Sequence, residues 1–322
     1  MATGEQVKSL IRSHFGNDSE RFYTVALQVA AHEARQGHGA LAVEIRDLVD
    51  RERHSKSDGV RTVVSDLHGL VLTEEADTPK SALVIPTSLS ARIDRIIREY
   101  RQRHKLEAYG LDHRRKILLI GPPGTGKTMT AHVLAKELHL TLHTIQMDRL
   151  LTKFMGESSA KLRLVFEMIQ RECGAYLFDE FDAIGGERAS DSDVGEMRRV
   201  LNAFLQLIDQ DRSDSLIIAA TNIPKLLDRA LSRRFNDVLR YEVPQPADRK
   251  RLIANVLGCF LAQRFTWKQV IEQSEGLSHA EIDHACRDAI KDAILSEQSK
   301  VTAAKLLPIL EERRGVDHGL EG

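Results

Sequence analysis

Hydrophobic side chains recur at helical spacing at the start of the chain. Three segments before residue 54 each place apolar residues three and four positions apart, which brings them to one side of a helix. The first face holds Val7, Leu10, Ile11 and Phe15, the second holds Phe22, Val25, Ala26, Val29 and Ala30, and the third holds Leu41, Ile45, Leu48 and Val49. We therefore expect a small helical bundle over residues 1–54.

The middle of the chain alternates between short apolar runs and helical periodicity. The runs at 117–120, 175–178 and 216–220 predict buried strands, and a helix is expected over 129–138. Another helix should begin at Ser88 and turn one face inward, made of Leu89, Ile93, Ile96, Ile97 and Tyr100. This alternation predicts an α/β domain with a parallel sheet over residues 83–244. The charged, irregular stretch 55–82 is expected to be a linker with one short strand near 67–72.

Beyond Pro244 and Pro246 the periodicity is entirely helical. We expect helices at about 248–261, 267–273, 278–296 and 302–313, which together form a C-terminal helical domain over residues 245–322. Ser278 followed three residues later by Glu281 is a capping box, which predicts a helix N-terminus there.

Composition and charge argue against several classes of function and say little about the fold. The 322 residues carry 46 Lys and Arg against 47 Asp and Glu, so a large general attraction to nucleic acid is not indicated. Three cysteines without CxxC spacing predict neither a disulfide framework nor a zinc site. No apolar run approaches a membrane span and no signal peptide is recognised, so a cytoplasmic protein is expected.

The segment Gly121–Thr128, with the sequence GPPGTGKT, is a complete phosphate-binding loop. Its glycines let backbone N–H groups face phosphate oxygens without interference from a Cβ atom. Lys127 is expected to reach the β- and γ-phosphates, and the Thr128 hydroxyl to ligate Mg²⁺. A strand before the loop and a helix after it complete the context, because the positive end of the helix dipole faces the anion.

Two further strands end in polar residues that suit a triphosphate site. Asp179 follows the run at 175–178 and is expected to hold Mg²⁺ beside Thr128, while Glu180 would orient and deprotonate the attacking water. Asn222 follows the run at 216–220, where it could sense the γ-phosphate. The sequence therefore predicts an ATP-hydrolysing site with magnesium.

These motifs, in this order and spacing, resemble the AAA ATPases, over about residues 83–314. The resemblance implies a P-loop NTPase domain with a helical lid, preceded by a small helical N-terminal domain. It also implies a homo-oligomer, expected to be a hexameric ring, in which Arg233 and Arg234 act as arginine fingers in the site of a neighbouring subunit. The residues it places around the nucleotide are Pro122, Pro123, Gly124, Thr125, Gly126, Lys127, Thr128, Met129, Asp179 and Ala280. His279 stands where the family usually has glycine.

Lys153, Phe154 and Met155 are similar to the first pore loop of that family, which grips a polypeptide in the central channel of the ring. An aromatic ring and a thioether can contact any side chain, as a device that pulls on unspecified sequence requires. Packing of Phe154 and Met155 into a core is the alternative. Residues 187–193 correspond to the second pore loop.

Two classes of function remain open from the sequence. The favoured one is a ring ATPase that remodels, unfolds or activates a protein, and the alternative is a nucleic-acid-handling AAA+ switch such as a clamp loader, replication initiator or transposition regulator. The layout also resembles bacterial AAA proteins encoded beside a subtilisin-like serine protease, in modules for phage defence or plasmid maintenance. That resemblance implies a protease partner and an antiviral role.

Overall fold

The chain divides into two compact units, Met1–His68 and Gly69–Gly322, in a computed structural model. The structure describes residues 8, 19–36, 38, 41–43, 45–49, 69–152, 156–184, 191–223, 231 and 233–318. Within these ranges, no helix is both long and apolar enough to cross a membrane.

The first unit contains helix α2 (Ser19–Arg35), and residues 41–43 and 45–49 are also helical. The predicted inner face of α2 is confirmed, because Val25, Ala26, Val29 and Ala30 are buried. The expected third face is confirmed only at Val49, which is buried, whereas Leu41 and Leu48 are exposed and the unpredicted Ala42 is buried. Val49 forms a small apolar cluster with Ala26, against which Phe22 and Leu27 pack. The predicted segment around Val7 and Phe15 falls outside the described residues, except for Lys8.

Six strands form one sheet in the second unit, in the order β1-β3-β4-β5-β2-β6. The strands are β1 (Val71–Glu74), β2 (Lys116–Ile120), β3 (Leu142–Ile145), β4 (Ala175–Phe178), β5 (Leu216–Thr221) and β6 (Asp237–Arg240). β1 pairs antiparallel with β3 at one edge, and all other pairs are parallel. The predicted runs at 175–178, 216–220 and 117–120 are β4, β5 and β2, three neighbouring interior strands that are buried throughout, so the predicted α/β class is confirmed.

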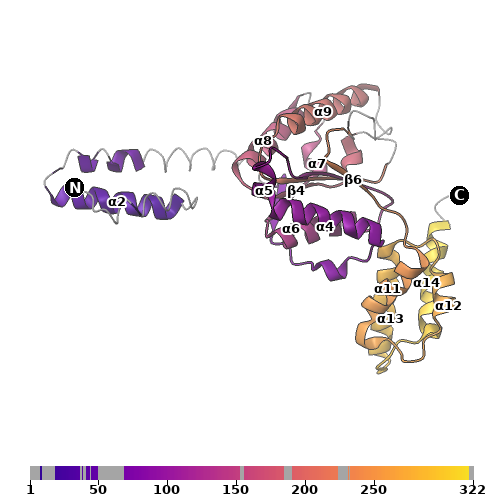
Figure 1. The fold of residues 1–322 in the computed structure, drawn as a ribbon. Helices are drawn as coiled ribbons and strands as arrows, with labels where there is room; N and C mark the ends of the chain where they lie inside the picture. The colour runs from indigo at the N-terminus through magenta and orange to yellow at the C-terminus, as the bar shows by residue number, and fades with distance from the viewer. Residues whose placement is uncertain are drawn as a thin grey trace. The chain divides into compact units, whose positions relative to one another are not determined.

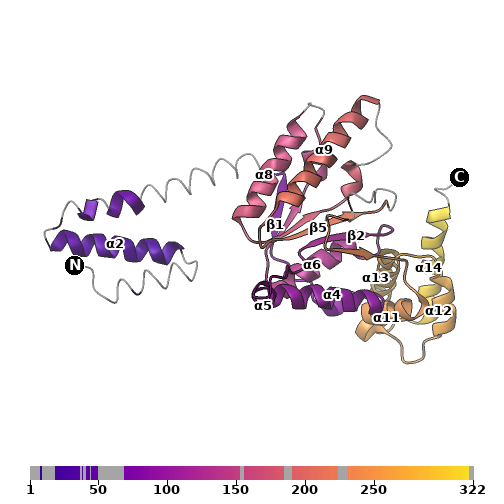
Figure 2. The ribbon, with the colours of Figure 1, turned by 45° about the horizontal axis from the view of Figure 1, so that its top comes forward.

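Helices cover both faces of this sheet, as Figures 1 and 2 show. On one face lie α4 (Thr87–Arg101) and α6 (Lys127–Leu138), and on the other lie α8 (Glu157–Arg171) and α9 (Asp191–Gln210). The five inward residues predicted for the helix from Ser88 are the five that α4 buries. On the opposite face Phe178 of β4 packs against Phe166 and Phe204, with ring centroids 6.0 and 5.1 Å away.

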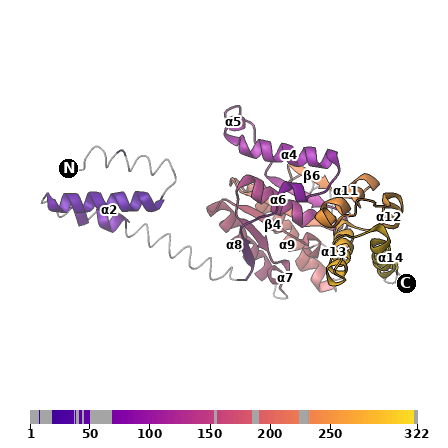
Figure 3. The ribbon, with the colours of Figure 1, turned by 90° about the horizontal axis from the view of Figure 1, so that it is seen from below.

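The C-terminal helices form a separate core beside the sheet. They are α11 (Pro246–Leu257), α12 (Trp267–Gln273), α13 (His279–Leu295) and α14 (Ala303–His318), and Figure 3 shows them grouped at one end of the unit. α12 has the predicted bounds. α11 ends earlier than predicted because Gly258 adopts φ +47° and opens the 3₁₀ turn η4 (Gly258–Phe260). Buried side chains such as Ile253, Ile282 and Leu306 form the apolar centre.

Several short elements connect these layers. They are η1 (Lys80–Ala82), α5 (Arg103–Glu107), α7 (Met147–Leu150) and η2 (Phe181–Ile184). The strand expected near 67–72 is β1, which begins at Val71 and pairs with Ile145. Part of the stretch expected to be a linker thus belongs to the sheet.

Candidate nucleotide-binding site

Strand order explains why three distant motifs meet. β4, β5 and β2 are neighbours and run parallel, so their carboxyl ends lie at the same edge of the sheet. The phosphate loop follows β2, Asp179 and Glu180 follow β4, and Asn222 follows β5. Parallel α/β sheets bind ligands outside these carboxyl ends. Residues 123–128 of the loop line one cavity of about 730 Å³ together with Asp179, Glu180 and Asn222, whereas Gly121 and the predicted contact Pro122 do not line it.

The loop curls through conformations that favour glycine. Gly124 has φ +69° and Gly126 has φ +100°, and both lie in the left-handed region. The Thr125 hydroxyl donates to the Pro122 carbonyl at 2.7 Å, which closes the turn from within. The first turn of α6 follows directly, so its unpaired N–H groups and the positive end of its dipole face the cavity.

Lys127 is buried at the base of the loop. Its Nζ donates to the carbonyls of Gly121 and Pro122 at 2.8 and 2.7 Å. Burial lowers the pKa of Lys127, whereas the charges of Asp179 and Asp182 act in the opposite direction. A buried cation shared between two neutral carbonyls gains strongly from an anion at this point.

Thr128, Asp179 and Glu180 form a connected set at the carboxyl end of β4. The Thr128 hydroxyl donates to Asp179 Oδ2 at 2.6 Å, and the Glu180 backbone N–H donates to Asp179 Oδ1 at 2.9 Å. Glu180 has φ +50°, which is uncommon for a residue with a side chain. Glu180 lines the cavity together with Thr128 and Asp179.

Asn222 is held by a contact that the sequence did not reveal. Its backbone N–H donates to Asp182 Oδ1 at 3.1 Å, which joins the end of β5 to the turn η2 after β4. The Asn222 side chain lines the cavity. Asp182 is therefore a positioning residue for Asn222, and only the adjacency of β4 and β5 makes this visible.

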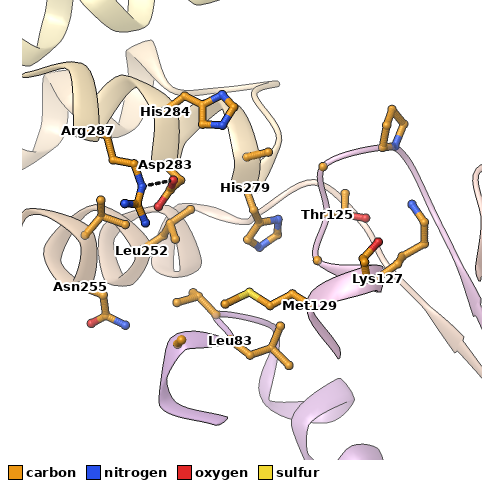
Figure 4. Close-up of a pocket in the computed structure, with 18 of the residues that line it drawn as sticks. Leu83, Thr125, Lys127, Met129, Leu252, Asn255, His279, Asp283, His284 and Arg287 are labelled. Atoms are coloured by element: carbon orange, nitrogen blue, oxygen red, sulfur yellow. Dashed lines mark hydrogen bonds and ion pairs between the residues drawn. The ribbon is translucent and has the colours of Figure 1, made fainter. Parts of the chain in front are cut away.

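The other end of the cavity is largely apolar and belongs partly to the C-terminal helices (Figure 4). Leu83 and Met129 come from the sheet side, and Leu252, Val256 and Ile290 come from α11 and α13. Asp283 and Arg287 of α13 form an ion pair of 2.6 Å at the rim. Helical periodicity alone could not assign these residues to a site, because their role depends on how α11 and α13 pack against the sheet.

The phosphate loop and helix α13 are joined directly. The Ala280 N–H donates to the Gly124 carbonyl at 3.0 Å. The predicted capping box is confirmed, with Ser278 accepting from the Glu281 N–H and Glu281 accepting from the Ser278 N–H. A Cβ on Gly124 would come within 2.7 Å of Ser278 Oγ, so the absence of a side chain permits this close approach.

The two arginines expected to act on a neighbouring subunit are not among the residues that line this cavity. Arg233 is exposed, and Arg234 Nε pairs with Asp209 Oδ2 of α9 at 2.6 Å. Lys153, Phe154 and Met155 lie outside the described residues, as do 187–190 of the second predicted pore loop.

The donor set fits a nucleoside triphosphate with a divalent cation. Backbone N–H groups, the helix dipole and the buried Lys127 supply positive potential for phosphates. The hydroxyl of Thr128 and the carboxylate of Asp179 are hard oxygen ligands, of the kind that Mg²⁺ prefers. The apolar end of the cavity suits a purine base, because pockets of this kind are mostly apolar with few polar groups.

Comparison with known proteins agrees with this chemistry. The model of the family described as "ATPase family associated with various cellular activities (AAA)" matches residues 117–243. An uncharacterised AAA family ATPase of Sinorhizobium fredii is 31% identical over 314 residues, which cover 94% of this chain and 92% of that protein.

Two other relatives are similar over shorter spans. The proteasome-activating nucleotidase of Methanothermobacter thermautotrophicus is 32% identical over 66% of this chain and 53% of its own length. The katanin p60 ATPase-containing subunit A1 of Strongylocentrotus purpuratus is 34% identical over 54% of this chain and 36% of its own length. The chain thus spans about half or less of these two proteins. From the family match and the long alignment, the chain belongs to the AAA family and is an ATPase that binds and hydrolyses ATP.

Proposed function

We propose that this ATPase works as a ring of copies, six in number, that uses ATP hydrolysis to remodel or unfold a protein partner. The observation that carries the proposal is the separation of its catalytic parts. Thr128, Asp179, Glu180 and Asn222 line the cavity, whereas Arg233 and Arg234 do not. Among the described residues, no arginine of the same chain lines the cavity at the phosphate loop, since Arg287 lies on α13, and a second copy could supply one to the γ-phosphate.

In the proposed chemistry, Lys127 leaves its two carbonyl partners for the β- and γ-phosphate oxygens. Thr128 and Asp179 would hold Mg²⁺ between them. The ion, when bound, neutralises part of the phosphate charge. Glu180 orients the attacking water and accepts its proton, and Asn222 fixes the position of that water or of the γ-phosphate.

A protein substrate is proposed from two lines of support. The segment Lys153–Phe154–Met155 offers an aromatic ring and a thioether directly before Gly156 and α8, in the order in which the family grips polypeptide. One similar protein is named a proteasome-activating nucleotidase. That name describes an action on another protein. The near-balanced charge of the chain speaks against nucleic acid as the general substrate.

A binding experiment with two substrate classes tests this proposal. We expect the Glu180→Gln protein, loaded with ATP, to bind fluorescent casein, an unfolded polypeptide, and Phe154→Ala in that background to weaken the binding at least about tenfold. Tyr109→Ala, which removes an exposed aromatic ring elsewhere in the chain, is the matched control and should leave casein binding unchanged. Salt-dependent binding of DNA without binding of casein would contradict the proposal and favour a nucleic-acid-handling switch.

We also propose that the N-terminal unit docks a partner, and that this partner is a subtilisin-like serine protease in a phage-defence or plasmid-maintenance module. Support comes from the exposed apolar side chains Leu41, Val43 and Leu48 of that unit, and from the resemblance in layout described above. The protein would then regulate or feed the protease by ATP-driven remodelling.

Truncation tests the docking proposal. The cut belongs after His68, because β1 and Leu83 are part of the sheet and of the cavity wall. Residues 69–322 should retain ATPase activity and fail to co-purify with the protease encoded in a neighbouring gene. If the truncated protein still captures that protease, the docking surface lies on the ATPase unit.

A further inference from the structure

His279 is a polar residue in the apolar part of the nucleotide cavity. It is the first residue of α13 and lines the cavity beside Ala280. Figure 4 shows its ring directed away from the helix toward Met129, between the phosphate loop and Leu252. Phosphates at Lys127 would therefore place the ribose and base of a nucleotide on the side of the cavity where this ring lies.

Both ring nitrogens of His279 are buried, and neither has a hydrogen-bond partner among the described residues. Leaving a buried polar group unsatisfied is costly, so buried nitrogens of this kind call for a partner. Burial lowers the pKa of His279, and Asp248, the Val84 carbonyl and Arg251 act on it more weakly, Asp248 and Val84 by raising the pKa. The ring is therefore neutral near pH 7, with one N–H and one free lone pair.

The Val84 carbonyl raises the pKa of His279 as an acceptor, although neither ring nitrogen forms a hydrogen bond among the described residues. A carbonyl in that position favours a proton on the ring nitrogen that faces it. The second nitrogen then keeps its lone pair and can only accept. In adenine the exocyclic group at C6 is an amino donor, whereas in guanine the same position carries an oxygen acceptor. A fixed acceptor attracts the first and repels the second.

We propose that His279 reads the base of the bound nucleotide by accepting a hydrogen bond from the exocyclic amino group of adenine. His279 is thereby a specificity-determining residue that favours adenine over guanine nucleotides. The inference rests on nucleotide binding in this cavity and adds the residue that selects the base. The size of the effect should be that of one hydrogen bond to a neutral group, between about threefold and tenfold in affinity.

The test pairs a change in the ligand with a change in the protein. ADP and its analogue purine riboside diphosphate, which lacks the exocyclic amino group, are titrated into wild-type protein, His279→Leu and the control His104→Leu. His104 is exposed on α5 and is not among the residues that line the cavity. Diphosphates are used because they are not turned over.

We expect loss of the amino group to weaken binding about threefold to tenfold in wild-type and His104→Leu proteins, and less than about twofold in His279→Leu. The affinity for GDP relative to that for ADP should be higher in His279→Leu than in wild-type protein. His279→Ala serves as a second variant that fits the site without added bulk. The proposal is overturned if wild-type protein binds ADP and the analogue equally, or if the penalty is the same with and without the imidazole. No binding of ADP to wild-type protein would instead contradict the assignment of the cavity.

Discussion

Glu180 holds a left-handed backbone conformation that a side chain makes unfavourable by about 1–3 kcal/mol. Two hydrogen bonds maintain it, since its N–H donates to Asp179 and its carbonyl accepts from the Ala183 N–H at 2.9 Å. Glu180 lines the cavity that the phosphate loop also lines. Strain of this kind persists where the surroundings over-determine it, and such places are often functional.

Removal of charge at Glu180 should separate binding from turnover. Glu180→Gln is expected to bind ATP with near wild-type affinity and to lower the rate of hydrolysis at least about 100-fold, because general-base catalysis contributes about that much. Lys127→Ala should instead lose ATP binding, and Glu275→Gln, an exposed glutamate outside the cavity, should change neither property. Nucleotide binding and phosphate release are the two measurements. Turnover near wild type in Glu180→Gln would remove this residue from the role of base.

Arg234 forms an ion pair within its own subunit, and this pair must break before Arg234 can contact the nucleotide site of a neighbouring subunit. Its pair with Asp209 is partly exposed and is worth no more than about 1 kcal/mol. If Arg234 acts on a neighbouring site, Asp209→Asn should raise the ATPase rate by up to about fivefold at protein concentrations that half-saturate assembly. Glu137→Gln removes a comparable surface pair with Arg101 and serves as the control. A loss of activity in Asp209→Asn would show that Asp209 positions the arginine.

At the scale of elements, the contact between the phosphate loop and α13 can be tested with two glycines of almost identical φ. Gly124 has φ +69° and Gly110 has φ +70°, but a Cβ at Gly124 would meet Ser278 and Ala280, whereas one at Gly110 would meet nothing within 4 Å. Each substitution by alanine should therefore carry the same free-energy cost of a left-handed backbone, about 1–2 kcal/mol. Only one of the two substitutions disturbs packing.

We expect Gly124→Ala to lower the free energy of unfolding by about 1–3 kcal/mol more than Gly110→Ala does. Gly124→Ala should also weaken ADP binding, because the loop must shift away from α13. Urea unfolding and ADP titration measure the two effects. Equal stabilities for the two variants would mean that the loop and helix separate at little cost.

Elements with strong local patterns could be predicted from the sequence, and elements defined by packing could not. The inner face of α4, the bounds of α12 and the capping box at Ser278 follow from apolar spacing and side-chain chemistry. β1 is largely exposed and has no apolar alternation, so its register with β3 exists only through pairing. The phosphate loop could be predicted because its own backbone conformation requires its glycines. The role of Asp182 and the apolar end of the cavity could not be predicted, because both depend on contacts with residues distant in sequence.

At the scale of the whole molecule, Arg233 and Arg234 do not line the cavity of their own chain, which predicts that ATPase activity requires assembly of several copies. An Arg233→Ala/Arg234→Ala protein and a Lys127→Ala protein should each be inactive, and mixing them should restore ATPase activity. Arginines supplied from another subunit accelerate related phosphoryl transfers by about 10³–10⁵, so recovery should be readily measured. Activity should also rise steeply with protein concentration. No recovery under conditions in which mixed assemblies form would mean that the arginines act within their own chain or not at all.

The hydrogen bond from the Ala280 N–H to the Gly124 carbonyl attaches the first turn of α13 to the phosphate loop. This attachment is the pivot about which α13 would tilt when the loop shifts. The helix has 17 residues and is therefore about 25 Å long, so a tilt of about 5° at the pivot moves its far end by about 2 Å. α11 and α14 pack against α13 and would be carried with it. A change as small as the loss of one phosphate could thus be amplified mechanically, from a shift within a single loop to a displacement at the outer surface of the C-terminal helices.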